Sequence, residues 1–155
     1  MQASTPAAAA GVIPGLALNA ALALCPGMQV QARDQAAEQA RLERLAAWAG
    51  AFTPMVSLEP PAALLLEVQG SLRLFGGLEA LRQCLRRALA RTGHTGLDAV
   101  APTPLAALWL ARARDPEGVT ELSALAGRLG RLPLRVTAWP QAVLEKLHSL
   151  GVESL

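Results

Sequence analysis

Residues Leu64–Gln83 have the sequence LLLEVQGSLRLFGGLEALRQ, which predicts a buried strand, a glycine-rich turn and an amphipathic helix. The run Leu64–Val68 is apolar except for Glu67, a pattern typical of a central strand. Gly70 and the pair Gly76-Gly77 bracket the turn. The helix that follows carries leucine and alanine on one stripe and arginine largely off it. This stretch therefore predicts a strand and a helix packed in one domain.

Further elements are expected on both sides of this stretch. One helix is expected to begin after Asp34, as its N-cap, and to end at Gly50. Other helices are expected over Leu16–Leu24, Leu105–Arg112, Glu121–Leu129 and Pro140–Leu150, and short strands over Met28–Gln31, Leu97–Ala101 and Leu134–Thr137. Three or four short strands form a small sheet, so the fold class expected is α+β, with α/β as the other reading of the element order.

The amino-acid composition limits the classes of protein to which this chain can belong. A chain of 155 residues is long enough for one core-forming domain, and 52% hydrophobic against 3% aromatic residues means that its core depends on Leu, Ala and Val. The formal charge of +2 is too small to indicate nucleic acid or an anionic membrane by itself. No window approaches a clean transmembrane span. Cys25 and Cys84 lie far apart, so free thiols in a reducing, cytoplasmic compartment are expected.

The central stretch also resembles the palm domain of Y-family (translesion) DNA polymerases, whose motif runs roughly S-I-D-E-A-F-L-D-V-T-G-S-x-x-L-F-G. Other segments resemble that family in the right order along nearly the whole chain: ASTPAAAAGVIPGL (3–16), ALALCP (21–26), FTPMV (52–56), LDAVAPTPLAAL (97–108) and the tail (144–155). The resemblance implies a small palm-type mixed sheet with helices packed on it. It further implies a fingers-like part over residues 1–56, a palm-like part over 57–137 and the start of a helix-hairpin-helix over 138–155.

Residues that the family uses on the incoming triphosphate differ in this chain. The resemblance places Thr5 and Ala8 where the family has Tyr and Arg, and the loss of that Arg removes a bidentate phosphate ligand. Thr103-Pro104 stand where the family has Asn-Lys, and Leu108 stands in place of a second Lys.

The acidic pair that holds magnesium in the family is also missing here. Its positions fall on Glu59 and Pro60 when the alignment starts from Ser57, or on Ala62 and Ala63 when it starts from Glu67. Two-metal phosphoryl transfer needs several carboxylates converging on ions about 4 Å apart. The degenerate positions are therefore Thr5, Ala8, Glu59, Pro60, Thr103 and Pro104, and no catalytic residue, metal ligand or cofactor is expected.

A retained scaffold with lost ligands resembles the ImuB-type branch of the family, in which polymerase-like proteins act in bacterial SOS mutagenesis. The resemblance implies a non-catalytic adaptor whose partners are an error-prone DNA polymerase, the sliding clamp and a RecA-like protein. The alternative is a piece of an active translesion polymerase that lacks its first catalytic strand. Without that strand, Leu64–Val68 would expose an unpaired edge, so self-association is also expected.

Other residues allow a functional and a structural interpretation. Arg82, Arg86, Arg87 and Arg91 could bind DNA phosphates, or lie solvated on the outer face of their helix. Glu59 and Glu67 could bind a metal, although carboxylates without partners rarely hold magnesium. Gln69–Leu74 fits a loose clamp-binding pattern, yet it forms the ordinary palm turn of the family. Structural roles are expected for the remaining candidates, namely His94, His148, Trp48, Trp109 and Trp139, with base stacking as the alternative for the tryptophans.

Overall fold

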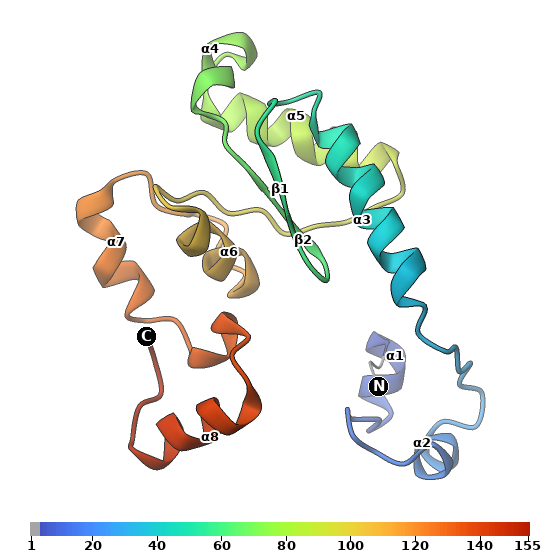
Figure 1. Ribbon diagram of the computed structural model, residues 1–155. Coiled ribbons are helices and arrows are strands. Elements are labelled where there is room, and N and C mark those ends of the chain that lie inside the picture. The colour runs from blue at the N-terminus through green and yellow to red at the C-terminus, as the bar shows by residue number, and fades with distance from the viewer. Residues whose placement is uncertain (1–3) are drawn as a thin grey trace. The chain divides into compact units, whose positions relative to one another are not determined.

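The computed structural model describes residues 4–155 and divides the chain into two compact units, Met1–Gln35 and Ala36–Leu155 (Figure 1). The units are described separately below. The domain boundaries expected from the family resemblance remain a prediction.

The first unit consists of two short helices around a small core. Helix α1 spans Thr5–Ala9 and α2 spans Leu18–Leu24, two residues shorter than the helix expected there. The core is made of small side chains: Ala7, Val12 and Ala21 are buried, and Leu16, Cys25 and Met28 pack against them. The prediction of a strand over Met28–Gln31 is wrong. This segment is irregular, with the side chain of Val30 54% exposed while Met28 packs against the core.

Helix α3, Gln35–Ala49, starts directly after Asp34 as expected, and from Ala36 onward it belongs to the second unit. Leu42 and Ala49 are buried on its apolar face, and the chain leaves the helix at Gly50. Beyond the helix, Phe52 is buried between two aromatic rings. Its ring centroid lies 5.2 Å from that of Trp48, edge to face, and 5.7 Å from that of Phe75, stacked.

The sheet is a hairpin of two antiparallel strands, β1 (Val56–Glu59) and β2 (Ala63–Leu66), joined through the cis bond Pro60-Pro61. The expected strand over Leu64–Val68 is therefore present but shifted, and β1 was not foreseen. Beyond Leu66 the pairing continues with a single bond from the Glu67 amide to the Met55 carbonyl. Thr53 closes this end, because its hydroxyl donates to the Glu67 carbonyl and accepts from the Met55 amide.

A turn and a long helix follow the hairpin. The 3-10 helix η1 (Gln69–Ser71) and α4 (Leu72–Phe75) form the turn, so the segment with the clamp-binding pattern is folded as helix. Gly76 and Gly77 both have positive φ, 79° and 110°, a backbone conformation that glycine adopts readily and other residues rarely do. Helix α5 (Leu78–Arg91) then carries the expected apolar stripe, with Leu81 fully buried.

The last third of the chain packs around helix α6, Pro104–Arg112. Leu110 is buried there with Leu132 and Val136, which come from the region after helix α7. The other elements in this last third of the chain are α7 (Leu122–Leu129), the 3-10 helix η2 (Leu134–Thr137) and α8 (Gln141–Ser149).

The predictions of two strands in this region are wrong. Leu134–Thr137 forms η2, in which the Thr137 hydroxyl donates to the Leu134 carbonyl at 2.8 Å. Leu97–Ala101 is an extended segment outside any sheet, and the Val119 amide donates to the Val100 carbonyl at 2.7 Å. A single backbone bond does not make a ladder.

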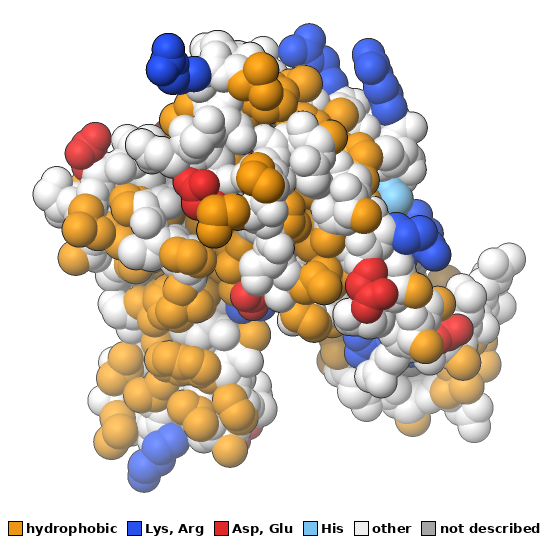
Figure 2. Space-filling view, turned by 45° about the horizontal axis from the view of Figure 1, so that its top comes forward, with side chains coloured by type: hydrophobic (Ala, Val, Ile, Leu, Met, Phe, Trp, Pro, Cys, Tyr) orange, Lys and Arg blue, Asp and Glu red, His pale blue; other side chains and the backbone are white. Residues whose placement is uncertain are grey.

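The fold class is α+β, as expected, with a sheet of two strands in the part of the chain that the structure describes. Cys25 and Cys84 are free thiols. Among residues 4–155 no helix has the length and apolarity to cross a membrane. Figure 2 shows hydrophobic side chains over much of one face, and several large ones are strongly exposed, including Leu74, Leu97 and Leu122.

Candidate functional site

The hairpin tip occupies the place that the family resemblance assigns to the acidic pair. Glu59 is the last residue of β1 and pairs with Ala63, the first residue of β2. Pro60, Pro61 and Ala62 form the turn between them, with a cis bond between the two prolines. The second carboxylate of a pair is therefore absent at the tip, where two rigid rings follow Glu59.

Glu67 does not join Glu59. A carboxylate oxygen of Glu67 accepts a bond of 2.7 Å from the backbone amide of Gln69 and so holds the start of η1. In the described part of the chain, three or more His, Cys, Asp or Glu side chains nowhere gather in a metal-binding arrangement.

Thr103 and Pro104 have a visible structural role at the start of α6. The Thr103 hydroxyl accepts from the Ala106 amide at 3.4 Å, which is the bond of an N-cap. Pro104 follows in the first turn, where the missing amide hydrogen costs no helical bond. This pair therefore begins a helix, which is a sufficient reason for its presence.

Ala8 lies exposed on α1 in the first unit. The side chain of Thr5 lies outside the described residues. The short aliphatic side chain of Ala8 offers no charge or donor to a phosphate.

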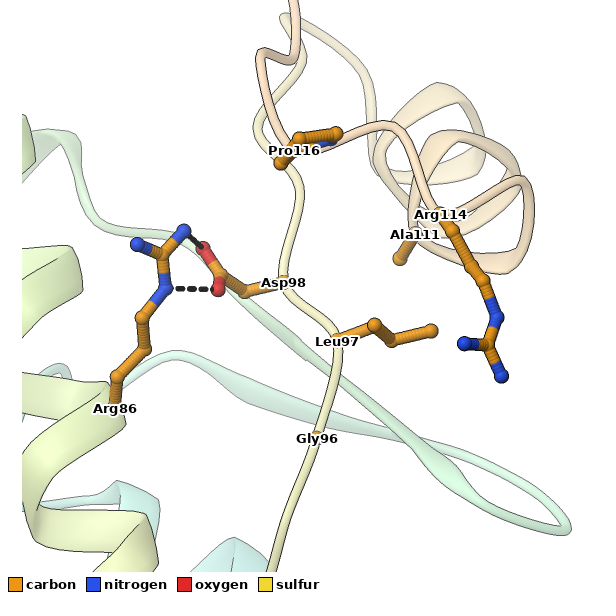
Figure 3. Close-up of a pocket in the computed structure, with 7 residues that line it drawn as sticks. All are labelled: Arg86, Gly96, Leu97, Asp98, Ala111, Arg114 and Pro116. Carbon is orange, nitrogen blue, oxygen red and sulfur yellow. Dashed lines mark hydrogen bonds and ion pairs between the residues drawn. The ribbon is translucent and has the colours of Figure 1, made fainter. Parts of the chain in front are cut away.

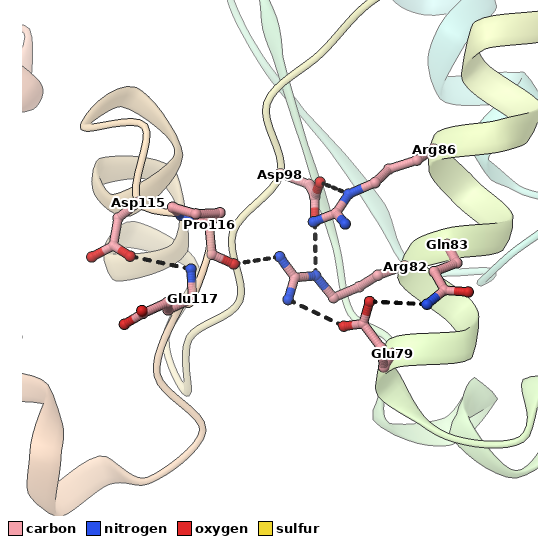
Figure 4. Close-up of polar contacts among 8 residues, drawn as sticks. All are labelled: Glu79, Arg82, Gln83, Arg86, Asp98, Asp115, Pro116 and Glu117. Atoms are coloured by element: carbon pink, nitrogen blue, oxygen red, sulfur yellow. Dashed lines mark hydrogen bonds and ion pairs between the residues drawn. The ribbon is translucent and has the colours of Figure 1, made fainter.

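The arginines of α5 divide into two groups. Arg82 and Arg86 both bind the carboxylate of Asp98, with Arg82 Nε 2.8 Å and Arg86 Nη2 3.0 Å from Asp98 Oδ2 (Figure 4). Arg82 also donates to the Pro116 carbonyl at 2.6 Å, and its side chain is only 12% exposed. Arg82 thus joins α5 to the extended segment and to the loop after α6. This is a structural contact that the sequence did not predict.

Arg87 and Arg91 are exposed at the same helix. The side chain of Arg87 donates to the Gln83 carbonyl of its own helix at 3.3 Å. DNA binding by the four arginines remains a prediction, and it fits Arg87 and Arg91 better than the two arginines held by Asp98.

The electrostatics of Asp98 follow from these contacts. Burial by itself raises the pKa of the carboxyl, but hydrogen bonds from Arg86 and Arg82 outweigh burial and hold the pKa of Asp98 below its usual range. The bond to Asp98 in turn raises the pKa of Arg86. A second ion pair lies nearby, where Arg128 binds Asp115 through two nitrogens at 2.6 and 2.7 Å and lowers the pKa of that carboxyl.

A cavity of about 220 Å³ lies beside Asp98, between α5, the extended segment and the end of α6 (Figure 3). Its charged lining consists of Arg86, Asp98 and Arg114, and the rest is mostly apolar. The only acid in this lining is already neutralised by arginine. The cavity therefore presents neither a free base nor a nucleophile for catalysis.

Replacing Asp98 by asparagine is expected to destabilise the second unit at pH 7 by on the order of 1–3 kcal/mol, because it removes the 2.8 Å ion pair of Arg82 and leaves that side chain only the longer pair with Glu79, at 3.6 Å. The folded-state pKa of Asp98 is depressed, so its contribution is present above the unfolded pKa near ~3.9 and disappears as pH falls through the folded value. Urea unfolding at pH 7 and near pH 3 measures this: the difference in free energy of unfolding between the unchanged protein and Asp98→Asn should be smaller near pH 3. Glu153→Gln, an exposed residue, is the control for charge loss; an equal loss there would contradict the prediction.

The chain belongs to the impB/mucB/samB family, whose model matches residues 1–112. This is the Y-family, UmuC-like class that the resemblance indicated. Protein ImuB of Caulobacter vibrioides (strain NA1000 / CB15N) is 32% identical over 142 residues, which are 92% of this chain and 31% of that protein. Protein ImuB of strain ATCC 19089 / CIP 103742 / CB 15 matches with the same values. The chain thus spans about a third of the length of these relatives. No solved structure gives a significant match.

Proposed function

We propose that this chain is a non-catalytic, polymerase-like module of bacterial DNA damage tolerance, acting as an adaptor for an error-prone DNA polymerase. The observation that carries the proposal is the hairpin tip, where Glu59 is followed by Pro60 and Pro61 in place of a second carboxylate. Family membership and the similarity to ImuB support the damage-tolerance part.

The other degenerate positions support the same proposal. Thr103 uses its hydroxyl to cap α6, and Pro104 has no side-chain donor for a phosphate. Ala8 cannot replace a guanidinium. Transfer of a nucleotide by two metal ions requires carboxylates that hold both ions and cations that hold the triphosphate. The adaptor role then depends on protein contacts, with an error-prone polymerase, a sliding clamp and a RecA-like protein as the proposed partners in the cytoplasm.

A primer-extension assay with magnesium tests the proposal. We expect no nucleotide incorporation above the enzyme-free background, both for this chain and for the longest reading frame that contains it. An active translesion polymerase on the same primer is the positive control. Magnesium-dependent incorporation by the longer protein would overturn the non-catalytic part and favour the alternative, a piece of an active polymerase.

A second arm of the test addresses the partners. Tagged protein recovered from cells after DNA damage should carry an error-prone polymerase. Recovery of the same amount by an unrelated tagged protein of similar charge would contradict the adaptor role.

A further inference from the structure

A second cavity of about 220 Å³ lies between α3 and the end of α5. Helix α3 contributes Arg41, Arg44, Leu45 and Trp48, and the segment after α5 contributes Thr92 and His94. These residues all belong to the second unit. No carboxylate lines the cavity, so its two guanidinium groups give it a local positive charge that the small net charge of the chain conceals.

A chain of hydrogen bonds holds one of these guanidinium groups in place. Arg41 Nε donates to His94 Nε2 at 2.8 Å. His94 Nδ1 lies 3.0 Å from the Thr92 carbonyl and 2.9 Å from the Thr92 hydroxyl, which itself donates to the Leu89 carbonyl. With Nε2 as the acceptor, Nδ1 is the ring nitrogen that donates to the Thr92 carbonyl. The end of α5 thus orients Arg41 while leaving the two terminal nitrogens of that side chain without a bond in the described residues.

Arg44 lies one turn further along α3 and is exposed. Its side chain makes no hydrogen bond or ion pair with any described residue. Residues three apart on a helix are neighbours, so Arg41 and Arg44 present adjacent guanidinium groups. A planar guanidinium fork matches the oxygens of a phosphate and binds them in pairs.

Trp48 adds an aromatic surface to the same cavity. It is half-buried, and its edge-to-face contact with Phe52 restrains the ring. A restrained, partly exposed indole loses little entropy when a planar group stacks on it, and every nucleobase offers such a planar face. Leu45 supplies an apolar wall beside it.

We propose that this cavity binds a nucleotide, with its phosphate on Arg41 and Arg44 and its base against Trp48. The inference does not depend on the adaptor role, since it uses neither the hairpin tip nor the start of α6. The same chemistry is offered by a free nucleotide and by a nucleotide within single-stranded DNA, and the experiment distinguishes these two sources.

Binding is measured by fluorescence anisotropy of a short fluorescein-labelled oligo-dT, with unlabelled thymidine monophosphate and inorganic phosphate as competitors. Arg44→Ala should weaken oligonucleotide binding by about tenfold or more and lower the slope of log affinity against log salt by about one. Arg44→Lys keeps the positive charge but loses the planar guanidinium fork, so its affinity for the oligonucleotide should lie between that of the unchanged protein and that of Arg44→Ala. Arg131→Ala, at an exposed arginine that does not line the cavity, is the matched control and should change affinity less than about twofold.

Trp48→Leu separates stacking from charge. It should weaken binding of the oligonucleotide and of thymidine monophosphate while leaving competition by inorganic phosphate unchanged; circular dichroism checks that this variant remains folded. If thymidine monophosphate competes with an affinity equal to that of the oligonucleotide, the natural ligand is a free nucleotide. If only the oligonucleotide binds, the ligand is single-stranded DNA. Equal losses for Arg44→Ala and Arg131→Ala, indifference to Trp48→Leu in the folded variant, or no binding at all would each overturn the proposal.

Discussion

Replacing Gly118 by alanine is expected to lower the free energy of unfolding of the second unit by about 3 kcal/mol or more, equivalent to a fall of about 6–12 °C in melting temperature. Gly118 has φ of +66°, and a Cβ built there would lie 2.6 Å from the Val100 carbonyl oxygen and 3.0 Å from the Val100 amide nitrogen. Those atoms belong to backbone, so they cannot rotate away as a side chain would. The loop must move, and the 2.7 Å bond between Val119 and Val100 is lost with it.

The matched control for this substitution is Gly93→Ala. Gly93 has a similar φ of +75°, but a Cβ there would meet nothing within 4 Å. That variant should therefore show only the backbone strain of a left-handed alanine, about 1 kcal/mol. Thermal unfolding followed by circular dichroism measures both. Equal falls in melting temperature would mean that the approach to Val100 contributes nothing.

The helices of this protein were predictable because their signals are local. Asp34 and Gly50 bound α3, and Pro104 marks the first turn of α6. Periodicity also identified α5 and its buried stripe, including Leu81. Each of these signals lies within a few residues of the element that it defines, so no knowledge of the rest of the chain was needed.

The strands were less predictable, because a strand needs a partner and the partner is not local. Leu97–Ala101 has a strand-like composition, yet Val119 offers it only one backbone bond. No strand was expected over Val56–Glu59, which precedes two prolines, but it pairs along its whole length with Ala63–Leu66. Propensity alone could not decide either case.

The candidate sites show the same limit. That the arginines of α5 lie off its apolar stripe followed from helical spacing, but the contact of Arg82 and Arg86 with Asp98 joins residues 12–16 positions apart. One signal was present: Asp98 is a lone charge in an apolar segment, and such a charge requires a partner when it is buried. The contact between Arg41 and His94 spans 53 positions and has no comparable signal.

Replacing Leu110 by alanine is expected to destabilise the second unit by about 2–5 kcal/mol, the cost of removing a fully buried leucine and leaving a cavity. Leu110 is 0% exposed and packs with Leu132, which follows α7, and with Val136 of η2, so it joins α6 to both.

The same cluster includes Ala99 and Val119, so the loss should reach the segment that carries Asp98 and the loop that carries Gly118. Leu105 stands on the same helix with its side chain 52% exposed, and Leu105→Ala should therefore cost less than about 1 kcal/mol. Urea unfolding measures both variants, and hydrogen exchange at the Val119 amide reports whether its bond to Val100 opens more often. If Leu110→Ala costs no more than Leu105→Ala, α6 is not the centre of this core. If the cost is large but protection of the Val119 amide is unchanged, the extended segment is held by Arg82 and Arg86 through Asp98 rather than by the apolar cluster.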